Sequence, residues 1–409
     1  GSLRRAMRCL LPDHRNGPTR NSRQFRFSAF FKLKKKQAEL DFIDIDTSQD
    51  MRLFIDPYAI EMRDDELSAE LAHHITTFFE DVLTSLRKKD RVRAKFLTSN
   101  LGEPQETFLG MSKGKPQGRG MGRFDADQLL RALEASKAFK TGLITDLAEA
   151  ELFIDGIGPD KISDLTTNLI RAPLIKYTHE QCDLHNVPLT KHVPIAPVWD
   201  PDTRDWRSEY QDLPVVAGIP VILVPKVLVR LKLSLNSQEY YNGTVLNFLK
   251  SEHLASNSGL VRLLKNKSRK VFKKDLKQKH PFSKEFLTEV TQKNPRLLEF
   301  YKELKGARGA LENEDLERDY SETDFASMLS EKLKAIKSGS KHATEYHTAI
   351  AGILTFLFYP ELVYPVLEEG LHGGRKRIDL TFTNWSNNGF FANAKVFASN
   401  PSKIYYCRM

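Results

Sequence analysis

The stretch of sequence that decides the fold reads HGGRKRIDLTFTN and spans residues 372–384. It opens with a histidine and two glycines, followed by three cations: Arg375, Lys376 and Arg377. Apolar and polar side chains then alternate from residue 378 to residue 383, which is the period of a β-strand. Asp379 is one of the polar positions, so we expect it on the face opposite the apolar residues and close to the cations. A carboxylate in this setting is typical of a metal ligand in an enzyme that cuts phosphodiesters.

Elements on both sides of this stretch complete a small α/β unit. Upstream, Glu345 precedes an apolar helical run at His347–Tyr359, which ends at Pro360. Val363–Leu371 then predicts a strand that leads into the glycines, and Lys403–Cys407 predicts a third, apolar strand. The predicted order is a helix with an acid, a strand, a strand with an acid, and a further strand.

This order resembles the core of the PD-(D/E)XK nuclease superfamily, which has the restriction-endonuclease-like fold. Glu345 matches the helix acid of that family and Asp379 its strand acid, and Gly374–Asp379 (GRKRID) is similar to a motif of many restriction and phage-defence nucleases. The resemblance covers the last part of the chain. It implies that Glu345 and Asp379 hold Mg²⁺ (or Mn²⁺), and that Arg375 or Arg377 clamps the scissile phosphate.

The sequence departs from the family pattern at the third strand, which in the family carries Glu-x-Lys. Residues 404–409 read IYYCRM, where only Arg408 could replace the lysine. Asn393-Ala394-Lys395 has the spacing of a degenerate motif with Asn in place of the acid, although the same segment also reads as a short helix. We therefore expect a core that is incomplete at this strand, through truncation or as an inactive relative, and a nuclease that is weak or inactive as written.

Length and composition set the limits of the interpretation. A chain of 409 residues, 40% of them apolar, suggests two or three domains with ample core. The net charge of +9 favours an anionic partner, with an ordinary solvated basic surface as the alternative. Three widely spaced cysteines fit a reducing cytosol better than a disulfide framework. No apolar run reaches the ~18 residues that cross a bilayer, so we expect a cytoplasmic protein.

Changes in composition along the chain predict five segments and an α/β (α+β) fold class. Residues 1–26 read as a basic arm or leader, and residues 27–225 as a mixed α/β domain with a sensing or regulatory role. Residues 226–305 read as a basic helical region, 306–324 as a linker and 325–409 as the incomplete nuclease-like core.

The basic helical region contains the densest positive charge of the chain. Lys265–His280 holds eight lysines and arginines against one acid. Such a face can neutralise several phosphates and bind nucleic acid with salt-dependent, sequence-tolerant affinity, whereas the alternative is a solvated surface helix. In this segment the residues predicted to contact nucleic acid are Lys265, Lys267, Arg269, Lys270, Lys273 and Lys274, and they join Arg375, Lys376 and Arg377.

Two glycine-containing segments could contact phosphates. Gly110–Arg123 could wrap a phosphate or form a plain flexible loop. Gly156-Ile157-Gly158 with Lys161 resembles the hairpin of helix-hairpin-helix DNA-binding modules, in which backbone amides contact a phosphate. A strand at Glu151–Asp155 that turns into a helix at Pro159–Ile170 explains these glycines equally well.

Two other groups contain residue types that bind metals. Asp44, Asp46, Asp50 and Asp56 lack a glycine-containing ligand loop, so we expect solvent-facing acids on strands rather than a metal cluster. His179-x2-Cys182-x2-His185 could suggest zinc, but residues three apart on a helix diverge and no second Cys or His pair is near, so we expect a surface helix.

The resemblance implies a metal-dependent DNA endonuclease of a bacterial defence or restriction-type system. The alternative is a non-catalytic defence protein that binds nucleic acid or a partner, and a third possibility is a scaffold indifferent to nucleic acid. Expected partners are nucleic acid, double-stranded DNA in the first place, and another copy of the chain or a defence-system protein, with no membrane.

Overall fold

The computed structural model describes residues 25–110, 123–306, 309–317, 320–371, 376–397 and 403–406. Helices dominate, and the strands form small antiparallel sheets of two or three strands, which confirms a mixed α/β class. Residues 1–24 of the expected leader, most of the glycine-rich segment, Arg375 and Arg408 lie outside the described residues. None of the helices in the described part has the length and apolar character to cross a membrane.

The N-terminal part is built around one long amphipathic helix, α4 (Glu66–Arg87), whose apolar spacing buries one face. Asp65 caps it by accepting a 2.9 Å hydrogen bond from the Ser68 amide. The other helices of this part are α2 (Phe27–Phe30), η2 (Gln37–Glu39), α3 (Pro57–Glu61), α5 (Arg91–Thr98), α6 (Arg123–Ala135), α7 (Lys137–Lys140), α8 (Ala150–Phe153), α9 (Pro159–Leu169) and α10 (Arg171–His185).

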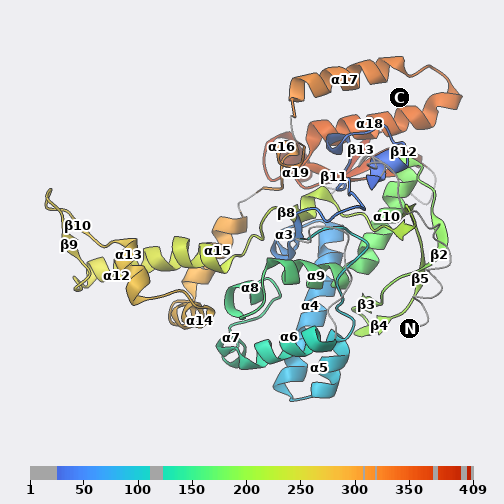
Figure 1. Cartoon of the computed structure of the whole chain (residues 1–409). Helices are drawn as coiled ribbons and strands as arrows, with labels where there is room; N and C mark the ends of the chain where they lie inside the picture. Colours follow the sequence, from blue (N-terminus) through green and yellow to red (C-terminus); the bar gives the residue numbers. More distant parts are fainter. Residues whose placement is uncertain are drawn as a thin grey trace, which may run out of the picture.

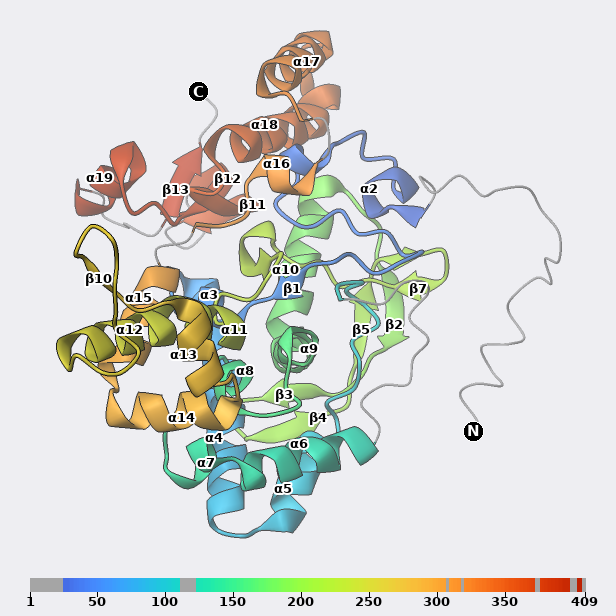
Figure 2. The ribbon, with the colours of Figure 1, turned by 60° about the vertical axis from the view of Figure 1, so that its left-hand side comes forward.

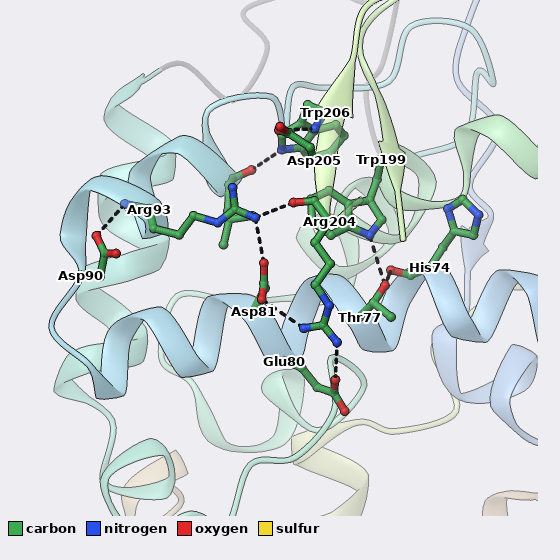
Figure 3. A network of polar contacts seen from close by, with 11 residues as sticks. His74, Thr77, Glu80, Asp81, Asp90, Arg93, Trp199, Arg204, Asp205 and Trp206 are labelled. Atoms are coloured by element: carbon green, nitrogen blue, oxygen red, sulfur yellow. Dashed lines mark hydrogen bonds and ion pairs between the residues drawn. The ribbon is translucent and has the colours of Figure 1, made fainter. Parts of the chain in front are cut away.

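Short antiparallel strand pairs surround these helices. They are β1 (Phe54–Ile55) with β8 (Val229–Arg230), β2 (Thr190–Pro194) with β5 (Tyr210–Leu213), β3 (Val198–Asp200) with β4 (Asp205–Arg207), and β6 (Val215–Val216) with β7 (Ile219–Pro220). Figure 3 shows how the β3–β4 hairpin is fixed to α4: Trp199 donates a 3.2 Å hydrogen bond to Thr77, and Arg204 lies 3.1 Å from Asp81.

The middle of the chain carries an arm that projects away from the rest of the molecule (Figure 1). We call residues 246–280 the hairpin arm: α12 (Leu246–Ala255), β9 (Arg262–Leu263), β10 (Arg269–Lys270) and α13 (Lys273–Lys279). The predicted basic helical region contains several helices, but the hairpin of β9 and β10 was not predicted: Asn266 accepts hydrogen bonds from the Ser268 amide and hydroxyl and turns the chain. The flanking elements are η3 (Lys226–Leu228), α11 (Ser237–Glu239), the π-helix η4 (Tyr240–Val245), α14 (Lys284–Lys293) and α15 (Arg296–Gly306).

The C-terminal part has the predicted order of elements. Helices α16 (Asn313–Leu316), α17 (Glu322–Ala335) and η5 (Ser340–His342) lead into α18 (Ala343–Phe358), β11 (Leu362–Leu371), β12 (Lys376–Asn384), α19 (Gly389–Phe397) and β13 (Lys403–Tyr406). The three strands form one antiparallel sheet in the order β11-β12-β13, with β12 in the centre. The predictions of the helix before Pro360 and of all three strands are confirmed.

One large apolar cluster links the described parts of the chain. It runs from Phe27 through α4 and α10 and includes Tyr359, Val363 and Tyr364 of the C-terminal part. A second cluster joins Leu380 and Phe382 of β12 to α18 and α10. Figures 1 and 2 both show the C-terminal sheet at one end of the molecule and α5–α7 at the other. The five segment boundaries remain a prediction.

Two expectations about polar residues were wrong. Asp44, Asp46 and Asp56 are buried rather than solvent-facing, because each accepts hydrogen bonds that compensate for its loss of water. Helix α10 is not a surface helix: Cys182 and His185 lie inside the main core or against it.

Candidate functional site

Asp379 lies in the central strand of the C-terminal sheet. Its neighbour Ile378 pairs with Glu369 of β11, and Leu380 pairs with both Leu367 of β11 and Tyr406 of β13. For Lys376, Arg377 and Asp379 the structure describes the backbone alone. The predicted strand acid therefore lies beside β11, one residue before the part of β12 that pairs with β13.

The two faces of β12 differ in chemistry. Leu380 and Phe382 are buried against Ala351 of α18 in the second apolar cluster. Thr381 and Thr383 instead line a cavity of about 260 Å³, which is also bordered by three acids of α4 and α10: Glu66, Glu70 and Glu180. The face toward α18 is thus apolar, and the opposite face is polar and acidic.

Glu345 lies in the first turn of α18, where the helix dipole favours an acid. Its side chain is 65% exposed, and one carboxylate oxygen lies 3.4 Å from Nδ1 of His342. Among the side chains that the structure describes, no group of three or more His, Cys, Asp or Glu residues is arranged to hold a metal ion. Because Mg²⁺ needs several oxygen ligands, Glu345 alone does not make a metal centre.

Lys395 lies in helix α19 and not on a strand beside Asp379. Its Nζ is 3.7 Å from a carboxylate oxygen of Asp64, and its side chain is only 20% exposed. The interpretation of Asn393-Ala394-Lys395 as a short helix is confirmed, and the interpretation as a degenerate active strand was wrong. Lys395 thus forms an ion pair between the C-terminal part and the loop before α4.

The hairpin arm presents cations to solvent. Its single acid between Lys265 and His280, Asp275, is already paired with Arg262 at 2.7 Å. Arg269 donates a hydrogen bond to the Leu254 carbonyl within the arm, and Lys273 donates one to the Asn242 carbonyl of η4. Five further lysines are exposed, and within the described part of the chain none of their side chains has a hydrogen bond or ion pair: Lys265, Lys267, Lys274, Lys277 and Lys279. Lys270 lies 5.1 Å from the ring of Phe272.

Lys161 lies near the start of α9, after the glycine turn. The prediction of a strand before this turn was wrong, since Ala150–Phe153 is the helix α8. Gly156 has φ +77°, a conformation that glycine adopts without strain. Lys284 donates hydrogen bonds to the carbonyls of Ile154 and Ile157 at 2.9 and 2.8 Å, so the turn is held from within the protein.

Acids close to Lys161 disfavour a phosphate at this turn. Burial, together with Asp160, Glu103 and Asp50, raises the pKa of Asp164 to about 8. Burial is the largest cause of this shift, and the neighbouring carboxylates add to it; the same negative charges would repel an added phosphate. Lys161 is therefore a weaker candidate than the arm lysines.

Sequence reasoning missed a group of buried cations between the N-terminal part and the C-terminal sheet. Lys226 is fully buried, with Nζ 4.1 Å from the centre of the Tyr359 ring. Burial, opposed by Asp41, lowers the pKa of Lys226 to about 8. Arg63 is equally enclosed: Nε donates to Asp65 at 2.8 Å, and the guanidinium lies against Trp385. These residues lie far apart in sequence, so no local pattern could have indicated the group.

The fold and the arm define a mixed α/β protein with a projecting basic hairpin and a C-terminal three-stranded antiparallel sheet. The chain belongs to the family described as Domain of unknown function (DUF8370), whose model matches residues 32–236. This match ends at Asn236, the residue that caps α11, so the hairpin arm and the C-terminal sheet lie beyond it. No curated protein and no solved structure matches the chain.

Proposed function

We propose that this protein binds nucleic acid, double-stranded DNA in the first place, through the hairpin arm. The observation that carries this proposal is the set of five exposed arm lysines on a hairpin that projects from the molecule (Figure 1). Because Asp275, the one acid among residues 265–280, is paired with Arg262, these lysines have no counter-charge within that segment. A phosphate backbone supplies that charge.

The arm predicts a particular kind of binding. Lysines that neutralise phosphates release condensed counterions. The logarithm of the binding constant therefore falls linearly with the logarithm of the salt concentration, with a slope of about −0.9 for each phosphate contacted. Contacts with phosphates carry no base information, so the affinity should be tolerant of sequence. Fluorescence anisotropy with labelled double-stranded DNA, single-stranded DNA and RNA of equal length tests the proposal and ranks the partners. Equal and negligible binding of all three would refute it.

A second candidate is metal-dependent hydrolysis of the bound nucleic acid by the C-terminal sheet. The three-stranded sheet, with Asp379 in its central strand, favours this candidate. Helix α18, which carries Glu345, packs on the face of Leu380 and Phe382, whereas the alternation along β12 assigns Asp379 to the opposite face. For hydrolysis, Glu345 and Asp379 would both have to reach one Mg²⁺ or Mn²⁺ ion from opposite faces of the sheet, and the ion would neutralise charge on the phosphate. Lys395 lies in helix α19 and forms an ion pair with Asp64, so no described lysine takes the place of the Glu-x-Lys lysine. Hydrolysis should therefore be slow or absent.

The biological setting that we propose is bacterial defence or restriction, with another copy of the chain or a defence-system protein as partner. The resemblance of Gly374–Asp379 to motifs of restriction and phage-defence nucleases supports this setting. Phage plating on bacteria that express the wild-type protein or Asp379→Ala tests it. Equal plaque counts on both strains and on an empty-vector strain would speak against it.

A further inference from the structure

A cavity of about 430 Å³ lies where the N-terminal part, the end of α15 and the turn after β12 meet. Its base is formed by buried residues, among them Tyr58 of α3 and Ser234. Its rim includes Asn387 and Asn388, which are exposed, so the cavity opens to solvent. The volume falls within the range of about 300–1,000 Å³ that is usual for small-molecule sites, and a junction between parts of a chain is a common place for them.

Arg230 gives this cavity an unsatisfied positive group. It borders the cavity, it is 9% exposed, and Nε has no hydrogen-bond partner among the described residues. One Nη atom donates to the carbonyls of Val227 and Val229, which fixes the guanidinium in place. The neighbouring carboxylate of Asp56 is already used, because it accepts from the amide and hydroxyl of Ser234 and from the Tyr58 amide. The charge of Asp56 still favours the guanidinium, but no carboxylate bonds to it directly, so its Nε remains a donor without an acceptor, and an anion can supply that acceptor.

The other charged groups that border the cavity are Lys305 and Glu361. Lys305 also lines it and is paired with Glu239 on the far side. Glu361 is the one acid on the lining, and it is half-exposed, where solvent screens its charge. Among the described lining residues, Arg230 is therefore the cation that has no direct ion pair.

Trp385 adds a flat aromatic surface to the same cavity. The guanidinium carbon of Arg63 lies 4.1 Å from the centre of this ring and covers one side of it. The ring is half-buried and borders the cavity as well. A ring fixed in this way is a platform on which a planar group can stack.

We infer that this cavity binds a small anion that carries a planar ring, of the nucleoside monophosphate class, with the anion at Arg230 and the ring at Trp385. The site is separate from the hairpin arm and from Asp379. It joins the N-terminal part to the turn after β12, so its ligand bridges segments that are distant in sequence.

Calorimetric titration with AMP, GMP, CMP and UMP tests this inference, with inorganic phosphate as the anion without a ring and adenosine as the ring without an anion. At least one nucleotide should bind more than about tenfold tighter than either control compound, which corresponds to about 1.4 kcal/mol. It should also change the tryptophan fluorescence of the wild type, and this change should be lost in Trp385→Phe.

Asn387→Asp is the discriminating variant, because Asn387 is an exposed rim residue whose side chain has no hydrogen bond among those described, so folding should be unaffected. The added negative charge should weaken nucleotide binding about fivefold or more. Gln278→Glu on the arm makes the same change of charge elsewhere and should leave the binding unchanged, as should Lys265→Gln with Lys267→Gln. The inference is overturned if no nucleotide binds, if phosphate binds as tightly as the nucleotides, or if Asn387→Asp binds like the wild type.

Discussion

The guanidinium carbon of Arg63 lies 4.1 Å from the centre of the Trp385 ring and joins the loop before α4 to the turn after β12. The Arg63 side chain is 1% exposed and is also paired with Asp65. A cation over an aromatic face is worth most when both groups are shielded from water. This contact, together with Lys395–Asp64, fastens the C-terminal part to the start of α4.

We predict that Arg63 and Trp385 are energetically coupled. In a double-mutant cycle with Arg63→Met and Trp385→Leu, the coupling in the free energy of unfolding should be about 1–2 kcal/mol. Urea unfolding followed by circular dichroism measures it. Arg63→Met combined with Trp206→Leu is the control: Trp206 packs on Phe78 and Trp199 instead, so that pair should be additive within about 0.5 kcal/mol. Additivity in both cycles would contradict the coupling.

We also predict a loss of stability in mild acid that depends on His185. Burial, together with the charge of Lys35, lowers the pKa of His185 to about 3, whereas an unfolded histidine titrates near pH 6.5. Below pH 6.5 the unfolded chain therefore binds a proton that the folded protein excludes, so stability is complete above this pH and falls as the pH drops toward 3. The slope is about 1.4 kcal/mol per pH unit, or about 2 kcal/mol at pH 5.

The measurement is the free energy of unfolding at pH 7 and pH 5 for the wild type and His185→Gln. The variant should lose about 2 kcal/mol less than the wild type over this interval. The matched control is His73→Gln, on the exposed side of α4, which should retain the pH dependence of the wild type. The assignment fails if His185→Gln has the same pH dependence as the wild type.

Local signals in the sequence predicted much of the C-terminal part and α4. The apolar spacing in Glu66–Arg87 and the alternation in β12 depend only on neighbouring residues, so they could be read without the fold. The hairpin of the arm was missed because its strands are only two residues each, although Asn266 and Ser268 were a turn signal. The burial of the acids and cations could not be predicted from the sequence, because their partners are distant along the chain, as Asp41 and Tyr177 are.

Cys182 should be inert in the folded protein. It is buried in α10, and burial raises the pKa of its thiol to about 12, so almost no thiolate is present at neutral pH. Brief treatment with iodoacetamide followed by peptide mass spectrometry should show Cys182 unmodified under native conditions and fully modified in concentrated guanidinium chloride. Rapid native modification would show that α10 is not packed as described.

Hydrolysis of DNA in the presence of Mn²⁺ or Mg²⁺ should be weak or absent, and any residual cutting should stop with EDTA and in Asp379→Ala. Glu345→Gln should reduce it, whereas Glu331→Gln, an exposed acid of α17, should not. Plasmid nicking measured on agarose gels is sensitive enough for slow turnover. Robust cutting that Asp379→Ala abolishes would contradict a weak enzyme, and cutting that survives this substitution would contradict the role of Asp379.

The salt dependence of DNA binding tests the central proposal most directly. Anisotropy titrations of labelled double-stranded DNA at several salt concentrations compare the wild type, Lys265→Gln/Lys267→Gln and Lys88→Gln/Lys89→Gln. The last pair also lies on an exposed turn, and like the first it includes one lysine with positive φ, so it matches both charge and backbone conformation. We predict a steep slope for the wild type and the control, and a slope shallower by up to about 1.8 for the arm variant. Equal affinities and slopes for all three proteins, or no binding at low salt, would contradict DNA binding by the hairpin arm.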